Sequence, residues 1–597
     1  MKYFCNPVNI NYRYQFNADP RRPKMQICRE AADPSMIFFK GKYYIFASMT
    51  LSVWVSEDMA HWDSYRLPEN LPLYDYAPDV RVIGEYVYFC ASKRGEVCSH
   101  YRTKDVLNGP YEEIPGSFDF WDPNLFCDDD GRIYFYWGCS NAAPIWGVEL
   151  DPETLLALGE RRALIFGDAW SKGYERVGED HSRYPKSEAE IDRALEKFFH
   201  MQGPGAGQQV PEEYIPLIRG MLSDKPYIEG AWMDKYEGKY YLQYAFAGTQ
   251  YNIYGDGVYV GDSPLGPFAL ADNNPYSYKP GGFLPGAGHG STMRDRQGNL
   301  WHAATMRISK NHDFERRVGI WPGGFDEDGE LFCNQRYGDW PMASEDGRMD
   351  PWKEPPWYLL SYGKAAEASS YVEGKEPGRA TDENIQTWWQ AASAESGEWL
   401  QVDLGEAYTV NAVQVNFADD GIDIPVPGKI RGTTQARYIE EKDYVTRWKL
   451  EGSLDGEHYF IIEDKSEAET DLSHDLVVRE KGMRLRFLKL TVVEVPYGQK
   501  PCISGLRAFG VGDGDKPKVP EFEAVRENDL DMTVKITDGD AVGYNVLWGS
   551  SPDKLYHSYM IFWKEQHVGA LVKGRKYYVR VDGFNENGIT IGRTVKL

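Results

Sequence analysis

The stretch DPSMIFFKGKYYIFAS (residues 33–48) contains a polar residue, a run typical of a β-strand, a turn with glycine and an aromatic second strand. This order is typical of a β-hairpin. It recurs in APDVRVIGEYVYFCAS from Ala77, DPNLFCDDDGRIYFYWG from Asp122, EGAWMDKYEGKYYLQYA from Glu229 and GHGSTMRDRQGNLWHAA from Gly288. Regular repetition of such units predicts a β-propeller with five blades.

Polar residues open four of the five units at nearly the same spacing. Asp33 lies 8 residues before the turn glycine of its unit, and Asp122, Glu229 and His289 each lie 9 residues before theirs. Equivalent positions in different blades converge on the central channel of a propeller. We therefore expect three carboxylates and a histidine at one funnel mouth. The alternative is that these acids are ordinary loop residues before strands, where aspartate is common.

Length and composition limit the possible classes of protein. A chain of 597 residues is too long for one core, and plentiful glycine and proline fit a β-rich fold. The formal net charge of −25 disfavours a nucleic-acid partner. No run approaches the roughly 18 apolar residues of a membrane span. The start, MKYFCNPVNINYRY, shows no signal peptide, and the eight cysteines form no Cys-x-x-Cys pair. These features favour a cytoplasmic protein with reduced thiols, although a secreted protein without its leader would look the same.

The propeller is expected to occupy residues 1–345, with one interruption. The interval from Asp122 to Glu229 is 107 residues, against 89 for the two blades between Asp33 and Asp122. The excess has helical spacing and no strand alternation. We therefore expect a partly helical insertion at about 168–224, near the funnel mouth. It either shapes substrate choice or is a plain surface elaboration.

Two further β domains are expected after a linker. The linker is the proline-rich stretch 346–363. Alternating strands and turns predict a β-sandwich at 364–512. Short strands and a core Trp548 predict a second sandwich, of immunoglobulin or fibronectin type III kind, at 517–597. The predicted fold class is thus all-β, a five-bladed propeller followed by two sandwiches.

Three carboxylates in one funnel suit the hydrolysis of a glycosidic bond. Inversion needs one carboxylate to deprotonate water and one carboxylic acid to protonate the leaving oxygen. A further carboxylate raises the pKa of that acid by like-charge repulsion. Flat aromatic surfaces for sugar rings are also available near the acids, unless these residues are blade core. The candidates are Trp54, Trp121, Phe126 and Trp232.

Residues 28–340 resemble a glycoside hydrolase of family 43. The matching phrases include ADPSMIFFKGKYYIFAS, YAPDV, WDPNLFCDDDGRIYFYWG, YIEGAWMDKYEGKYYLQYA and GAGHGSTM. The resemblance implies a five-bladed propeller and an inverting mechanism. It gives Asp33 the role of general base, Glu229 that of general acid, and Asp122 that of pKa modulator. The phrase EGAW after the acid replaces the EGP of many relatives.

The resemblance also implies binding residues. His289 matches an axial histidine that in many members contacts a water-coordinated calcium or sodium ion, and no other cofactor is expected. A last-blade arginine of the family contacts substrate hydroxyls, which here is Arg316, with Arg317 as the alternative; either could instead form a salt bridge on the strand surface. Asp79 lies only 5 residues before its turn glycine, so we expect a structural role for it.

The middle domain resembles the discoidin, or coagulation factor 5/8 type C, sandwich, which includes carbohydrate-binding module family 32. The phrases are ATDENIQTWWQA, GEWLQVDLG, LEGSLDG and ISGLRAFG. Members often hold a structural calcium through an aspartate like Asp382 and a glutamate, but Gly505 occupies the glutamate position here. The domain either binds sugar or supports the propeller.

The leading hypothesis is an exo-acting inverting glycosidase that releases terminal α-L-arabinofuranose from plant-derived glycans. β-D-Xylosidase is the nearest alternative within the family, followed by β-D-galactofuranosidase. A glycoside phosphorylase would need a phosphate site, for which the pair Arg316 and Arg317 is the nearby candidate. Retaining fructan enzymes open with Asn-Asp-Pro-Asn-Gly, whereas this chain has AADPS. A non-catalytic glycan-binding protein would not need all three carboxylates.

Overall fold

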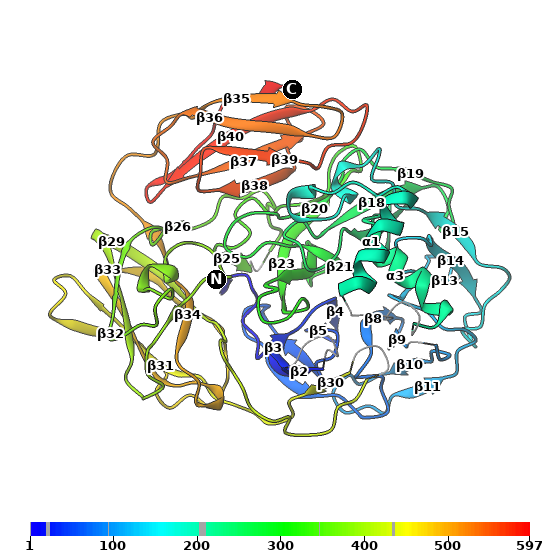
Figure 1. Ribbon diagram of the computed structural model, residues 1–597, viewed down its shortest axis with the longest axis horizontal. Coiled ribbons are helices and arrows are strands. Elements are labelled where there is room, and N and C mark those ends of the chain that lie inside the picture. The colour runs from blue at the N-terminus through cyan, green and yellow to red at the C-terminus, as the bar shows by residue number, and fades with distance from the viewer. Residues whose placement is uncertain (1, 19–23, 94, 202–209, 345–346, 433–435) are drawn as a thin grey trace.

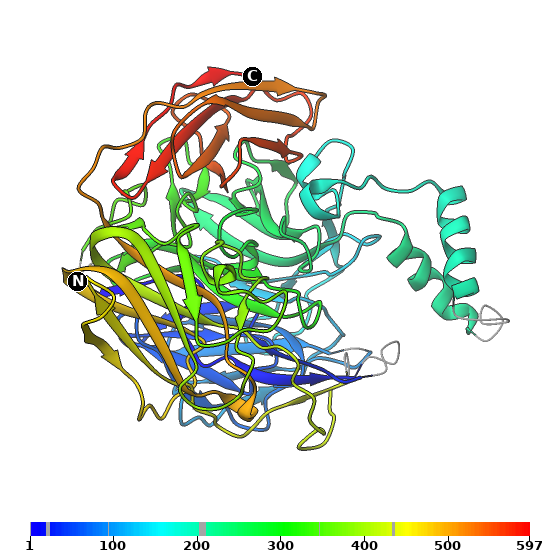
Figure 2. The ribbon, with the colours of Figure 1, turned by 60° about the vertical axis from the view of Figure 1, so that its left-hand side comes forward.

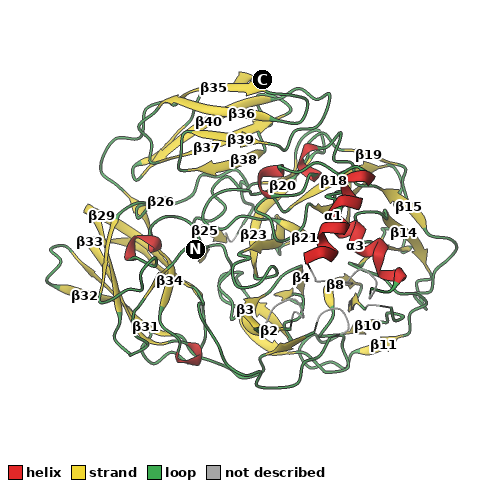
Figure 3. Cartoon of the chain, viewed as in Figure 1, coloured by secondary structure: helices red, strands yellow, loops and turns green. Residues whose placement is uncertain are grey.

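The computed structural model describes residues 2–18, 24–93, 95–201, 210–344, 347–432 and 436–597 (Figure 1). Strands dominate all three parts of the chain (Figure 3). None of the helices in the described ranges is long and apolar enough to cross a membrane.

Five antiparallel sheets follow one another along the first half of the chain. Blade 1 contains β4 (Ser35–Phe39), β5 (Lys42–Phe46), β6 (Ser52–Ser56) and β7 (Asp63–Arg66). Blade 2 contains β8 (Tyr76–Ile83), β9 (Tyr86–Ser92), β10 (His100–Thr103) and β11 (Glu112–Ile114). Blade 3 contains β12 (Asn124–Cys127), β13 (Ile133–Trp137), β14 (Ile145–Leu150) and β15 (Arg162–Ile165). Blade 4 contains β16 (Ile228–Tyr236), β17 (Lys239–Phe246), β18 (Gly255–Gly261), β19 (Phe268–Leu270) and the short β20 (Ser277–Tyr278). Blade 5 contains β21 (Gly288–Arg294), β22 (Leu300–Arg307), β23 (Arg316–Phe325) and β24 (Leu331–Cys333).

The first strands of the five blades form a closed ring. β4 packs beside β8, β8 beside β12, β12 beside β16, β16 beside β21, and β21 beside β4. Apolar and aromatic side chains fill the space between neighbouring sheets. The five-bladed propeller predicted from the repeats is therefore confirmed, and the five polar or small residues that open the units lie at one end of the ring.

The expected helical insertion is also confirmed. It contains the short 3-10 turns η1 (Gly173–Glu175), η2 (Glu179–His181) and η3 (Glu212–Tyr214), and the helices α1 (Glu188–Met201) and α3 (Ile215–Leu222). Arg219 of α3 pairs with Glu188 and Asp192 of α1 at 2.7 and 2.5 Å, which holds the two helices together. They project away from the propeller as a hairpin (Figure 2).

A β-sandwich follows the propeller. Its sheet joins β26 (Tyr358–Leu359), β27 (Ala365–Ala368), β28 (Trp389–Gln390), β29 (Trp399–Phe417), β31 (Arg447–Ser453), β32 (Tyr459–Asp464), β33 (His474–Glu494) and β34 (Cys502–Val511), with the 3-10 turns η4 (Pro377–Ala380) and η5 (Pro496–Gly498). β26 belongs to the predicted linker, so that stretch is bound to the sandwich by strand pairing. Gly505 faces the propeller, where an added Cβ atom would lie 3.0 Å from the ring of Phe283.

The N-terminal segment ties the propeller to the sandwich. β1 (Lys2–Phe4) pairs with β25 (Met342–Ser344) after the last blade. β2 (Arg13–Asn17) pairs with β3 (Gln26–Glu30) on one side. On its other side β2 pairs with β30 (Arg437–Ile439), which comes from a long excursion of the middle domain. The N-terminal segment therefore takes part in a sheet shared between two domains.

The last part of the chain forms two facing sheets. One holds β35 (Glu521–Arg526), β36 (Met532–Asp538) and β39 (Glu565–Val568), and the other holds β37 (Gly543–Gly549), β38 (His557–Ile561), β40 (Tyr578–Asn585), β41 (Gly588–Thr590) and β42 (Val595–Lys596). Trp548 is fully buried, as predicted.

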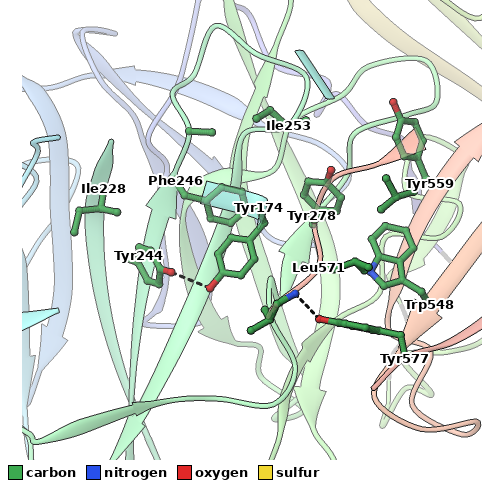
Figure 4. Close-up of a cluster of buried hydrophobic side chains, with 14 of the residues drawn as sticks. Tyr174, Ile228, Tyr244, Phe246, Ile253, Tyr278, Trp548, Tyr559, Leu571 and Tyr577 are labelled. Carbon is green, nitrogen blue, oxygen red and sulfur yellow. Dashed lines mark hydrogen bonds between the residues drawn. The ribbon is translucent and has the colours of Figure 1, made fainter. Parts of the chain in front are cut away.

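The core of this last sandwich is continuous with that of blade 4 and the insertion (Figure 4). Trp548 lies edge-on to Tyr278 of blade 4, with ring centroids 6.0 Å apart. The insertion joins the same cluster, because Gly173 N donates to Leu571 O at 2.8 Å. Arg176 and Asp531 form a buried ion pair beside it at 2.5 Å. We infer that the last sandwich and the propeller unfold together.

Truncating one side chain of this shared core tests that inference. Leu571 is fully buried, so Leu571→Ala should lower the free energy of unfolding by about 2–5 kcal/mol through lost burial and a residual cavity. Calorimetry should still show one cooperative transition. Ile591→Ala, at a side chain 57% exposed in the same sandwich, is the control with little effect. A separate low-temperature transition for the last sandwich would contradict a shared core.

Candidate active site

A cavity of about 430 Å³ opens where the first strands of the blades begin. Asp33, Asp122 and Glu229 line this cavity together with His289 and Arg316. These five side chains come from blades 1, 3, 4 and 5 and are far apart in the sequence. The structure therefore brings the three predicted carboxylates, the histidine and the arginine into one pocket.

Each blade enters its first strand from a residue in the left-handed backbone region. The φ angle is 50° at Asp33, 49° at Ala77, 51° at Asp122, 58° at Gly230 and 50° at His289. This conformation costs residues other than glycine about 1–2 kcal/mol, and it persists only where the surrounding structure holds it. The sequence repeat is therefore also a repeat of backbone conformation, which directs equivalent side chains to the axis.

Glu229 departs from this pattern by one position. The left-handed residue of blade 4 is Gly230, so Glu229 lies one residue earlier than the acids of blades 1 and 3. The pairing of β16 with β17 shifts between Glu229 and Trp232. A Cβ atom on Gly230 would lie 2.7 Å from the His289 ring. The glycine after the acid is thus required both for its φ angle and for the room that it leaves.

Asp33 is buried among hydrogen-bond donors. Ser48 Oγ donates to Oδ2 at 2.7 Å, and Arg316 Nη1 donates to Oδ1 at 3.2 Å. Burial by itself raises the pKa of this carboxyl, but Arg316, His289 and the hydroxyls of Ser48 and Thr305 outweigh burial and lower the pKa. Asp33 is therefore ionised at neutral pH, as a base that deprotonates water must be.

Asp122 has the opposite electrostatic environment. Carboxylate oxygens of Asp122 and Glu229 and the Sγ of Cys139 lie within 4.8 Å of one another. Burial and the charges of Glu229 and Asp33 raise the pKa of Asp122 to about 7, although His289 opposes this shift. Because two close carboxyl groups resist joint ionisation, this side of the pocket retains a proton at neutral pH.

Two donors hold the carboxyl group of Glu229. Tyr254 Oη donates to Oε1 at 2.5 Å, and Cys139 Sγ donates to Oε2 at 3.3 Å. Burial and the nearby carboxylates raise the pKa of the Cys139 thiol, so the thiol remains a neutral donor. Sequence reasoning missed both residues. Cys139 follows the second strand of blade 3 and Tyr254 precedes the third strand of blade 4, positions that the repeat of first strands does not mark.

Three of the four expected sugar-stacking residues lie elsewhere. Trp121 lines the cavity. Trp54 and Phe126 are buried in the cores between blades. Trp232 is buried beneath the Arg81 guanidinium, which lies 3.4 Å from the centre of its ring. The predictions for Trp54, Phe126 and Trp232 were wrong. Trp54 and Phe126 fill the cores between neighbouring blades, whereas Trp232 packs against Arg81 of blade 2 and donates to Thr292 of blade 5.

Of the remaining candidates, Arg316 lies in the pocket, whereas Arg317 and Asp79 lie outside it. Arg316 donates to Asp33, whereas Arg317 points to the middle sandwich and donates from Nε to His474 Nε2 at 2.8 Å. Asp79 lies outside the cavity wall and accepts a hydrogen bond from Leu125 N at 2.7 Å, which joins blades 2 and 3. Its position is the structural one expected from its different spacing.

The insertion forms part of the cavity wall. It contributes Val177, Arg183, Met221 and Asp224, and its helix α3 is anchored where Asn141 Nδ2 donates to Gly220 O at 2.7 Å. The insertion is therefore part of the site and not a distant surface elaboration. In the sequence, only the location of the insertion between two blades indicated that it lies at the site.

His289 lies among the carboxylates of the pocket. His289 Nδ1 lies 3.5 Å from Asp33 Oδ1 and 3.8 Å from Asp122 Oδ2. Burial lowers the pKa of His289, but the carboxylates of Asp33, Asp122, Glu229 and Asp256 outweigh burial and raise it. The calcium or sodium ion expected near His289, contacted through water, stays a prediction, and no catalytic step is assigned to it.

Comparison with known families agrees with this geometry. Residues 27–178 and 201–331 match the model of glycosyl hydrolases family 43. The propeller of this chain is a family 43 glycosyl hydrolase domain. Residues 379–489 match the NedA-like, galactose-binding domain, which is the type C sandwich expected for the middle domain.

Several family 43 relatives can be aligned with the chain. It is 27% identical over 335 residues to xylosidase/arabinosidase 43A of Humicola insolens, which covers 50% of this chain and 95% of the relative. It is 29% identical over 204 residues to a beta-xylosidase of Xylanibacter ruminicola, covering 30% of this chain and 53% of the relative. It is 24% identical over 278 residues to a xylosidase/arabinosidase of Bacteroides ovatus, covering 40% of this chain and 75% of the relative.

Solved structures show weaker overall similarity. A xylan beta-1,4-xylosidase from Bacillus halodurans C-125 has 15% identity and a TM-score of 0.39, covering 85% of this chain and 100% of that one. A thermostable family-43 glycoside hydrolase has 19% identity and a TM-score of 0.39, covering 59% of this chain and 100% of that one. Similarity at this level carries no conclusion about substrate.

Gly230→Ala tests the packing around the acid. The added Cβ atom would collide with the His289 ring and adopt a strained φ angle, so we expect destabilisation of more than about 1–2 kcal/mol. Any hydrolytic activity should fall with it, because Glu229 and His289 must both move. Gly238→Ala is the matched control, since Gly238 has φ of 78° but no atom within 4 Å of an added Cβ. Equal losses in thermal stability and activity for the two variants would refute the close-approach argument.

Proposed function

We propose that this protein is an exo-acting inverting glycosidase that removes terminal α-L-arabinofuranose from plant-derived oligo- or polysaccharides. The observation that supports this most is the opposite perturbation of two carboxyl groups in one pocket. The pKa of Asp33 is lowered and that of Asp122 is raised to about 7. Asp33 is thus ionised, as a base must be, and Asp122 holds a proton beside Glu229, the carboxyl group assigned as general acid.

In this mechanism Asp33 accepts a proton from water while the water oxygen attacks the anomeric carbon. The bond from that carbon to the leaving oxygen breaks, and Glu229 gives the leaving oxygen a proton. Tyr254 and Cys139 fix the orientation of the Glu229 carboxyl group. Asp122 retains the proton on the acid side by repelling a second negative charge. Arg316, on the cavity wall, is placed to bind a sugar hydroxyl.

The names of the relatives support a pentose substrate. Two are named xylosidase/arabinosidase and one beta-xylosidase. β-D-Xyloside hydrolysis is therefore the second candidate, and none of these names supports β-D-galactofuranoside. The insertion covers one side of the cavity, which favours a terminal sugar over an internal one.

The geometry disfavours the two more distant alternatives. A phosphorylase needs cationic groups for phosphate, but Arg316 already contacts Glu30 and Asp33, and Arg317 contacts His474. A glycan-binding protein without catalysis has no need for carboxyl groups with opposite pKa shifts.

Activity on nitrophenyl glycosides is the direct test. We expect release of nitrophenol from α-L-arabinofuranoside or β-D-xyloside, and a loss of about 10²- to 10⁴-fold in kcat for Asp33→Asn and Glu229→Gln. Asp79→Asn, which alters a buried acid outside the cavity, is the control and should retain the turnover of the folded enzyme. NMR of the first sugar released should show the inverted anomer. Full activity in both carboxylate variants would contradict the proposal.

The pH dependence follows from the two carboxyl environments. The acid side must be protonated, so kcat/KM should fall as pH rises through about 7, the value to which burial and the charges of Glu229 and Asp33 raise the pKa of Asp122. Ionisation of Asp33 should limit activity only at low pH, because its pKa is lowered. In Asp122→Asn the repulsion is gone, so the alkaline limb should move to lower pH. A profile that is flat to pH 9 would rule out this assignment.

A further inference from the structure

The middle sandwich contributes a strand to the sheet that leads into the active site. β30 pairs with β2 in the register Gln15↔Ile439 and Asn17↔Arg437. β2 pairs in turn with β3, which ends at Glu30, three residues before Asp33. Residues of the second domain are therefore fixed by backbone hydrogen bonds to the segment that carries the base.

Ile439 of this strand packs at the edge of the pocket. It is fully buried in a small cluster with Met49, Leu51, Tyr76 and Ala77. Tyr76 lines the cavity, and Ala77 is the left-handed residue that opens blade 2. The contact is therefore made with the blade entrances themselves and not with the outer surface of the propeller.

Arg437 extends from the same strand into the propeller and is fully buried. Its Nη1 donates to Glu30 Oε2 at 2.8 Å and also to Gln15 Oε1, and its Nη2 donates to Tyr76 Oη. This guanidinium thus joins the N-terminal hairpin, blade 2 and the middle sandwich.

Glu30 transmits this contact to the base. Its side chain is also fully buried, and its Oε1 accepts hydrogen bonds from Arg316 Nη2 at 2.5 Å and from Arg316 Nε at 3.1 Å. Arg316 Nη1 then donates to Asp33 at 3.2 Å. Four buried side chains of alternating charge, Arg437, Glu30, Arg316 and Asp33, therefore form a continuous line from the second domain to the pocket. We call them the charge line.

We propose that Arg437, contributed by the galactose-binding-type domain, is a positioning residue of the active site that acts through Glu30 and Arg316 on Asp33. The proposal rests on the assignment of Asp33 as general base. It gives the middle sandwich a function in the propeller's own reaction, separate from any glycan that its surface binds.

The charges explain why Arg437 is needed. With it, the charge line has two positive and two negative members. Without it, Glu30 keeps only Arg316 among the cationic partners that the described residues give it, and the line carries an uncompensated negative charge. Buried charges that lose a partner are strongly destabilising. Glu30 would then compete with Asp33 for Arg316, so the Asp33 carboxylate would lose stabilisation and its orientation.

Other titratable groups also face the line, and none of them is itself replaced in the variants compared below. They are Cys28, Tyr76, Asp122, Tyr254, His289 and His312. Because their positions are common to all variants compared below, a shift that follows the charge of position 437 is attributable to the line.

The test compares three variants on the nitrophenyl glycoside that the enzyme turns over. Arg437→Met should move the acidic limb of the kcat/KM profile to higher pH by about one unit, since Asp33 becomes easier to protonate. Arg437→Lys, which retains the charge, should move it less. The double variant Arg437→Met with Glu30→Gln removes one charge of each sign and should return the limb toward its original position.

Arg507→Met is the matched control. Arg507 is a buried arginine of the same domain whose guanidinium pairs with Glu383 at 2.8 and 2.9 Å, away from the charge line. It should lower the Tm without moving the acidic limb. The proposal is overturned if Arg437→Met lowers the Tm but leaves the limb in place, or if Arg507→Met moves the limb equally.

Thermal unfolding gives a readout that does not need turnover. If Arg437→Met is too unstable for an activity assay, the Tm values of Arg437→Met, Glu30→Gln and the double variant still decide. The Tm of the double variant should be higher than the value expected from adding the two single losses in Tm. Strict additivity would overturn the charge line. If the wild type hydrolyses none of the glycosides, the proposed function fails, and this Tm cycle still tests the link from Arg437 to Glu30 on its own.

Discussion

Mutual repulsion among three carboxylates in a partly buried pocket is the constraint around which this protein is organised. Left alone, such groups take up protons until none is a base. Here the cations are placed unequally: Arg316 lies against Asp33, and His289 lies between Asp33 and Asp122. The arginine side therefore ionises and the other side retains a proton. One pocket thus supports two opposite roles for the same type of side chain.

That asymmetry depends on parts of the chain far from the pocket. Asp33 depends on Arg316, which is fixed by Glu30, which is fixed by Arg437 of the middle sandwich. The insertion on the other side is held by Arg176 and Asp531 to the last sandwich. Both sandwiches therefore support the walls of the propeller's pocket, a role that is independent of whether either binds a sugar.

The sequence predicted what is local and repeated. The blade hairpins, the three acids, His289 and the helical insertion follow from periodicity and from equivalent positions in each repeat. The sequence did not predict side-chain contacts that lie outside this periodicity. Trp232 lies close to Glu229 in the sequence but is buried beneath Arg81 of blade 2, and Trp54 is buried in the core between blades 1 and 5. Arg437 lies more than 400 residues from Asp33, and no pattern marks one arginine of a β-sandwich as the partner of a propeller glutamate.

The strand shared between the N-terminal hairpin and the middle domain also sets an order of events during synthesis. Residues of the last blade end at Cys333, but β30 is not made until residue 439. At translation rates of about 5–20 residues per second, the ribosome adds that intervening stretch in roughly 5–20 s. Over this interval the nascent propeller holds Glu30 without its second arginine. Completion of the pocket is therefore a late step in biosynthesis.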